Sequence, residues 1–155
     1  LAAIDAAQHQ VDLEQYLIES GACTTRLVDA LCAAAERGVP VRCLFDDFGC
    51  QKLLADDRQR LLSAGVVIRW YNPLRWRRGG RNLYRDHRKL LVVDGEMGFV
   101  GGTGSTDLFW DPAAAVSPWH EVMVAMAGPL VADWQHLFDR QWQACHGRFA
   151  WRPRP

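Results

Sequence analysis

"VDLEQYLIESGACTTRLVDALCAAAERGVPVRCLFDD", residues 11–47, is the stretch that decides the fold. Its first eight residues are apolar and partly alternating, which predicts a strand. Apolar residues then recur at helical spacing from Leu27 to Ala35, and Gly38 ends this pattern, which predicts a helix beginning at Thr24 or Thr25. The final segment, 39–47, predicts a second strand that ends in acidic residues. A strand, a helix and a strand in this order predict a parallel pair joined by a right-handed crossover.

The rest of the chain continues the alternation of helices and strands. The further elements are predicted in this order: a helix over 52–65, a strand over 66–71, a loop over 72–86, a hairpin with an Asp94-Gly95 turn, a loop over 111–118, a strand over 119–126 and a helix over 128–142. We therefore predict an α/β fold with a mixed, mostly parallel sheet flanked by helices on both faces. The whole chain, 1–155, is predicted to form a single domain.

Composition and charge narrow the class of protein. Of the 155 residues, 49% are hydrophobic, which indicates a packed domain rather than a disordered chain. Lys plus Arg and Asp plus Glu both number 18, so any attraction to a charged partner must come from local clusters. The five cysteines are odd in number and include no C-x-x-C spacing, which favours a reducing compartment. The chain begins at Leu1, within what reads as a helix already under way, so we expect a fragment of a longer protein.

His87 and Lys89 lie two residues apart at the start of a predicted strand, so their side chains should share one face. An imidazole beside an ammonium group suits a phosphate, because the lysine neutralises oxygens while the imidazole attacks phosphorus or passes a proton. Residues 75–89 contain six arginines and one lysine against the single acid Asp86. The alternative is an ordinary solvated basic loop followed by an Asp-Gly turn.

The full pattern, H-x-K-x4-D, six residues and then Gly101-Gly102, resembles the signature of the phospholipase D superfamily. "NLYRDHRKLLVVDG", "FVGG" and "WHEVMVAMAGPLVADWQHLFDRQW" are similar to the first catalytic half of bacterial cardiolipin synthase-like phosphatidyltransferases. In this superfamily two such motifs form one site. One histidine becomes phosphorylated, and the other protonates the leaving alcohol and later activates the acceptor.

The resemblance implies roles for individual residues. His87 is the nucleophile or its acid/base partner, and Lys89 binds phosphoryl oxygens. Asp94, the third residue of the motif, is grouped with the catalytic residues in a structural or electrostatic role. Glu121, in "WHE", is the carboxylate that orients a histidine; the alternative is an ordinary strand residue. The further phosphate-binding candidates are Arg85, Gly102, Thr103 and Ser105. No metal and no organic cofactor is implied.

Two other residues match family positions, and one departs. Glu14 either buttresses the site or is an exposed strand residue, and Asp107 matches an acidic position after the glycines. Gly104 stands where the family has an asparagine that helps to hold the phosphate.

The resemblance also predicts partners. Since only one motif is present, the second must come from another part of the same chain or from a homodimer partner. The implied substrate is a phosphatidylglycerol-like phospholipid at a membrane surface. We expect a bacterial protein on the cytoplasmic side of the inner membrane, peripheral or anchored by segments outside this chain. The alternatives are a homodimeric endonuclease of the same superfamily, whose partner would be nucleic acid, and a degenerate phosphate-binding module.

Overall fold

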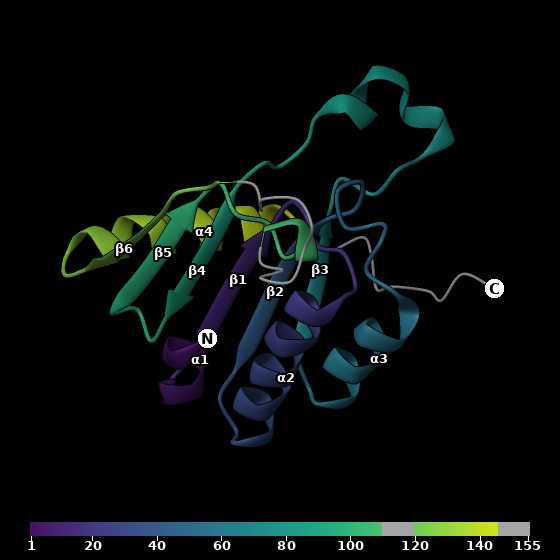
Figure 1. Cartoon of the computed structure of the whole chain (residues 1–155). Coiled ribbons are helices and arrows are strands. Elements are labelled where there is room, and N and C mark those ends of the chain that lie inside the picture. Colours follow the sequence, from purple (N-terminus) through teal and green to yellow (C-terminus); the bar gives the residue numbers. More distant parts are fainter. Residues whose placement is uncertain (110–119, 146–155) are drawn as a thin grey trace.

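Six strands form one sheet in the order β3-β2-β1-β4-β5-β6 in the computed structural model, which describes residues 1–109 and 120–145 except for the side chains at 77 and 78 (Figure 1). The strands are β1 (Val11–Gln15), β2 (Val41–Asp46), β3 (Val67–Tyr71), β4 (Lys89–Val93), β5 (Met97–Gly101) and β6 (Met123–Ala127). The helices are α1 (Ala2–Ala6), α2 (Ala22–Glu36), α3 (Ala55–Ser63) and α4 (Leu130–Ala144), with 3-10 segments η1 (Trp76–Leu83) and η2 (Asp107–Phe109).

The sheet is mixed, as predicted. β1 pairs in parallel with β2, and β2 with β3, whereas β1–β4, β4–β5 and β5–β6 are antiparallel. Parallel pairing is therefore confined to the first three strands, a smaller share than predicted, because the hairpin and β6 add only antiparallel neighbours. β4 runs opposite to β1, so its first residue lies at the same edge as the last residues of β1, β2 and β3. We call this edge, marked by Gln15, Asp46, Tyr71 and Lys89, the site edge.

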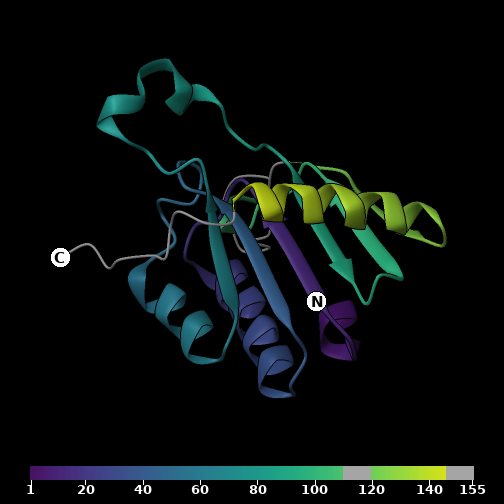
Figure 2. The ribbon, with the colours of Figure 1, turned by 180° about the vertical axis from the view of Figure 1, so that it is seen from behind.

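Helices cover both faces of the sheet (Figures 1 and 2). α2 and α3 lie on one face, above a core that includes Leu13, Cys43 and Phe45. α4 crosses the other face, where Phe138 and Trp142 pack against residues such as Leu90. Burying each of these large apolar side chains stabilises the fold by about 1.5–3 kcal/mol.

Most predicted elements are present with small changes in their ends. α2 begins two residues before the predicted Thr24, and α3 is shorter than the predicted helix over 52–65. The predicted strand over 119–126 is observed from Met123, and the predicted loop over 111–118 lies outside the described residues. No helix in the described part of the chain combines the length and apolarity needed to cross a bilayer.

The segment predicted as a loop over 72–86 contains η1 and projects beyond the site edge (teal in Figure 1). We call residues 74–83 the arm. Asn72, which has a positive φ of 39°, closes its base by donating from Nδ2 to the carbonyls of Arg81 (2.7 Å) and Tyr84 (2.8 Å). Asn82 adds reciprocal bonds with the backbone of Arg75. Because these hydrogen bonds join its two ends, the arm is a loop that leaves the sheet and returns to it at the same place.

Candidate active site

His87 and Lys89 meet at the site edge. Lys89 Nζ lies 3.2 Å from Nδ1 of His87 and donates to the His87 carbonyl oxygen at 2.9 Å. Lys89 is the first residue of β4 and lies opposite Gln15 of β1. The structure therefore brings together the two residues that the motif predicted to act on one phosphate.

Tyr16, which sequence reasoning missed, holds this pair from the side of β1. Its ring centroid lies 3.8 Å from that of His87, with the planes inclined by 31°, and Lys89 Nζ lies 5.1 Å from the same ring centroid. The ring faces of aromatic residues attract cations, so Tyr16 favours both the protonated lysine and a fixed imidazole orientation. The only signal in the sequence was an aromatic residue among polar residues within the predicted strand over 11–18.

Burial sets the electrostatics of Lys89. The side chain is only 7% exposed, and this burial lowers the pKa of Lys89 from its ordinary value, while the charges of Glu121 and Asp86 act in the opposite direction. A lysine that is poorly solvated has few competing water contacts. It therefore interacts more strongly with an entering phosphoryl group than an exposed lysine would.

The residues before His87 are held by Asp46, the last residue of β2. Its buried carboxylate accepts hydrogen bonds from the amides of Phe48 (2.9 Å), Gly49 (3.0 Å) and Asp86 (3.0 Å). Arg85 Nη1 also contacts it at 3.3 Å. The predicted strand over 39–47 did end in acidic residues, but only the fold shows that one of them supports the residues preceding His87.

Arg85 was predicted to bind phosphate, and the structure gives it partners within the protein. Its guanidinium donates to the carbonyls of Tyr84 (2.8 Å) and Asn72 (2.7 Å) as well as contacting Asp46. These contacts use one donor on each of the three guanidinium nitrogens. We therefore interpret Arg85 as a residue that positions the segment around His87, and its predicted role in binding phosphate stays a prediction.

Glu121 lies over Gly102, the second glycine of the motif. A Cβ atom built on Gly102 would come within 1.9 Å of Glu121 Oε2, so the carboxylate occupies the space that a side chain would take. The Gly102 amide also donates to the carbonyl of Val122 at 3.1 Å, which fixes this approach. Since the charge of Glu121 raises the pKa of Lys89, the carboxylate acts on the same site. Its predicted role in orienting His87 stays a prediction.

The loop after the glycines is turned toward α2. Ser105 is 4% exposed, and its hydroxyl lies 2.9 Å from the hydroxyl of Thr24. Asp107 accepts from the amides of Ala22 (3.0 Å) and Cys23 (2.7 Å), and so caps the start of α2. Ser105 is thus engaged with α2, and we leave it out of the phosphate site. The role of half-buried Thr103 stays a prediction.

Gly104, which replaces the asparagine of the family, is packed against Leu17. A Cβ atom there would lie 2.9 Å from both the carbonyl oxygen and the Cβ of Leu17. An asparagine would require the Leu17 backbone to move. The departure from the family pattern is therefore matched by a close approach of these two segments.

Asp94 lies at the opposite end of β4 from His87. Asp94 (φ 55°) and Gly95 (φ 67°) form the predicted tight turn, closed by the Glu96 amide donating to the Val93 carbonyl at 3.0 Å. The Asp94 carboxylate accepts from the amides of Gln8 (3.0 Å), His9 (2.7 Å) and Gln10 (2.9 Å). Its grouping with the catalytic residues is corrected, because these bonds join the hairpin to the segment between α1 and β1, which is the structural role also considered.

Glu14 is buried, at 1% exposure, and its Oε1 lies 2.8 Å from Nη2 of Arg88. The exposed-strand alternative is therefore wrong.

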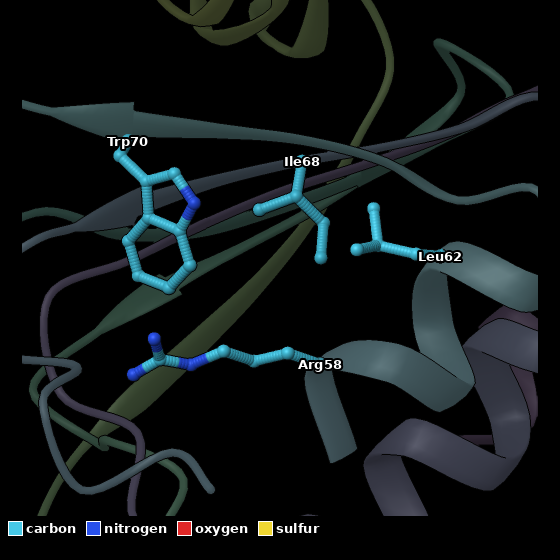
Figure 3. A pocket seen from close by; sticks show the side chains of 4 residues that line it. All are labelled: Arg58, Leu62, Ile68 and Trp70. Carbon is cyan, nitrogen blue, oxygen red and sulfur yellow. The ribbon is translucent and has the colours of Figure 1, made fainter. Parts of the chain in front are cut away.

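A small cleft of about 20 Å³ lies between α3 and β3, lined by Arg58, Leu62, Ile68 and Trp70 (Figure 3). Its volume suits about one water molecule. None of its four lining residues belongs to the group around His87.

Known proteins with similar structures share this fold. The phospholipase D family member Nuc from Salmonella typhimurium matches with a TM-score of 0.65 and 20% identity, over 92% of this chain and 83% of that chain. NucT from Helicobacter pylori matches with a TM-score of 0.67 and 15% identity, over 94% of this chain and 86% of that one. At these identities the likeness concerns the fold alone.

Sequence comparison is more specific. The cardiolipin synthase of Alkalihalophilus pseudofirmus is 32% identical over 143 residues, which are 92% of this chain and 28% of that protein. Cardiolipin synthase A of Pseudomonas putida is 33% identical over 142 residues, or 91% of this chain and 30% of that protein. The chain thus spans less than a third of the curated relatives it matches. The family model described as "Cardiolipin synthase, PLD-like domain" matches residues 1–142. The chain therefore belongs to the family of cardiolipin synthase, phospholipase D-like domains.

Proposed function

We propose that this chain supplies one half of the active site of a phosphatidyltransferase that works through a phosphohistidine. The observation that carries the proposal is the pairing of His87 Nδ1 with Lys89 Nζ at 3.2 Å, in a chain of the cardiolipin synthase family. The second histidine comes from a second motif, in the same protein or in a homodimer partner. The substrate is a phospholipid such as phosphatidylglycerol.

The reaction has two balanced steps. Since Lys89 lies at Nδ1, we assign the attack to Nε2: a P–N bond forms while the P–O bond to the leaving alcohol breaks, and the second histidine gives that oxygen a proton. An acceptor alcohol, or water, then loses its proton to the second histidine and attacks phosphorus, breaking the P–N bond. In this scheme His87 is the nucleophile; its exchange of roles with the second histidine remains the alternative.

The attack requires a change of partners at Nδ1. Nε2 needs its lone pair, so the ring proton must sit on Nδ1 and face an acceptor. Phosphoryl oxygens draw Lys89 Nζ away from the ring, and Glu121 is the carboxylate assigned to accept a hydrogen bond from Nδ1–H. This is the arrangement in which a histidine nucleophile is oriented by an acid.

The arm is assigned to the lipid surface. Trp76 is 99% exposed, Leu83 82% and Tyr84, which follows the arm, 70%. The arm carries four arginines and no acidic residue. Exposed apolar side chains next to arginines fit the boundary between acyl chains and anionic headgroups. The arm lies at the site edge, so its docking would bring His87 close to phospholipid.

The decisive experiment uses the full-length protein and phosphatidylglycerol labelled in either the headgroup or an acyl chain. We expect transfer or hydrolysis that is lost in His87→Ala and kept in His136→Ala, a control on the exposed side of α4. Activity in His87→Ala equal to that of the unchanged protein would refute the mechanism.

A homodimeric endonuclease is the second candidate, and the arginines of the 75–88 segment favour it. The balanced overall charge and the resemblance to synthases favour the transferase. Salt-sensitive cleavage of DNA without lipid turnover would identify the nuclease. Neither activity, with phosphate binding retained, would identify the degenerate module.

A further inference from the structure

Three ionisable side chains meet immediately beside His87, on the α4 side of the sheet. Arg88 Nη2 lies 2.8 Å from Glu14 Oε1 and 3.2 Å from Asp86 Oδ2, and Arg88 Nε donates to Asp86 Oδ1 at 3.2 Å. Glu14 is opposite Leu90, a residue that packs under α4. Lys89 directly precedes Leu90 in β4, and its side chain therefore points to the opposite face of the sheet. We call Glu14, Asp86 and Arg88 the back triad.

The back triad is shielded from solvent. The side chain of Glu14 is 1% exposed, that of Asp86 8% and that of Arg88 30%. Burial, together with the neighbouring Asp86 carboxylate, raises the pKa of Glu14 to about 9. Burial alone would raise the pKa of Asp86, but the neighbouring Glu14 and Arg88 hold it below its ordinary value. At neutral pH the two carboxyls, which both lie within 3.2 Å of Arg88 Nη2, therefore hold one proton, on Glu14, beside one cation.

Neighbouring ionisable groups leave this assignment intact. Tyr71 of β3 has a pKa raised by burial and by Asp86, and Cys145 after α4 has a pKa raised to about 11 by burial and then by Asp86. Both groups are neutral below pH 9. Arg69 and Lys89 add positive charge nearby, since Arg69 acts on Cys145 and Asp86 acts on Lys89.

The back triad is bonded to the main chain on both sides of His87. The Asp86 amide donates to Asp46 at 3.0 Å, and the Arg88 amide donates to the Asp86 carboxylate at 3.2 Å. His87 and Lys89 meanwhile contact Tyr16 through their side chains. The residues that flank His87 are thus anchored through one group of side chains, while His87 itself is presented through another.

We propose that Glu14, Asp86 and Arg88 form a positioning network for His87, in which Arg88, in contact with both buried carboxyls, keeps the 85–88 segment in place. None of the three touches the reacting atoms. The inference rests on the proposed function only where turnover is the readout. Loss of the Glu14 proton at alkaline pH leaves two buried carboxylates beside one guanidinium, which loosens the segment.

The test measures amide hydrogen exchange of the peptide spanning residues 84–90 in the full-length protein, by mass spectrometry. The variants are Glu14→Gln, Glu14→Ala and Asp86→Asn. The control is Asp139→Asn, an α4 residue paired with Arg42 on the same face. At pH 7, a glutamine has the shape and the neutral charge of the protonated Glu14, so Glu14→Gln and the control should keep the protection of the unchanged protein. Glu14→Ala and Asp86→Asn should exchange at least several-fold faster in this peptide.

The pH dependence of hydrogen exchange distinguishes a role in positioning His87 from a general contribution to stability. After correction for intrinsic exchange rates, the unchanged protein should lose protection in this peptide between pH 8 and pH 10, and Glu14→Gln should not. The alkaline limb of kcat should move upward in Glu14→Gln in parallel. Identical pH profiles in these two proteins would overturn the proposal, even if Glu14→Ala failed to fold. Exchange changes without any lipid turnover would leave the network standing and count against the proposed function alone.

Discussion

The ring of Tyr16 lies against the imidazole of His87, with centroids 3.8 Å apart, although 71 positions separate the two residues in the chain. The same ring faces Lys89 Nζ. One side chain immediately after β1 therefore limits the movement of both residues that the motif contributes. We expect the contact to matter more through the shape of the ring than through its hydroxyl.

Tyr16→Phe should keep turnover within about threefold of the unchanged protein, because the ring and its quadrupole remain. Tyr16→Ala should lower kcat by up to about 10²-fold, because a nucleophile displaced by about 1 Å loses its alignment. Steady-state kinetics on phosphatidylglycerol with the full-length protein would check this. Equal losses in both variants would instead point to a role for the hydroxyl.

Lys89→Met should abolish turnover without weakening the fold. Burial lowers the pKa of Lys89, so its folded-state pKa lies below the unfolded value, and the charged form is the one that burial disfavours. The free energy of unfolding should therefore rise with pH between the folded-state and the unfolded-state pKa of Lys89. Replacing the lysine by methionine should remove this pH dependence. Thermal unfolding at several pH values measures this. Lys52→Met, at an exposed residue paired with Glu19, is the control for turnover. A Tm lower by more than about 4 °C in Lys89→Met would contradict the expectation.

The two glycines of the motif should respond differently to alanine. In Gly101→Ala the new methyl group meets backbone, with the carbonyl oxygen of Val122 at 2.2 Å, so we expect a loss of about 1–3 kcal/mol in unfolding free energy. In Gly102→Ala the nearest neighbours of the methyl group are the carboxyl atoms at the end of the Glu121 side chain, which can rotate away, so stability should hold while turnover falls. Chemical denaturation and kinetics on the two variants would separate these effects. Full activity in Gly102→Ala would mean that the carboxylate over Gly102 is dispensable.

Asp94→Asn should act on stability rather than on chemistry. Burial alone would raise the pKa of the Asp94 carboxyl, but the hydrogen bonds that it accepts from three backbone amides hold its pKa below the ordinary value. Because the folded-state pKa is depressed, this stabilisation is present above the unfolded value and is lost as pH falls through the folded value. At pH 7 we expect a loss of about 1–2 kcal/mol, which should shrink in acid. Activity per folded molecule should be unchanged; a selective fall in kcat would return Asp94 to the catalytic group.

Local sequence patterns predicted much of the fold. Helical spacing predicted α2, and a run of apolar residues before Asp94-Gly95 predicted β4 and its turn, because both depend on neighbours within a few positions. The predominance of parallel pairing was overestimated, since partner choice among strands depends on contacts between distant segments. Helix ends moved by a few residues, as at Ala22, where Asp107 caps the helix from far along the chain.

The site divides in the same way. By itself the sequence determined that His87 and Lys89 lie side by side, because two positions of one extended chain share a face and no other segment is needed to join them. Only the tertiary structure decided what surrounds that pair: Tyr16 at its side, Asp46 before it, Glu14 behind it, and Asp94 at the far end of β4. Those contacts depend on which strands become neighbours and in which register. Neither the choice of neighbouring strands nor their register can be predicted from a short stretch of the chain.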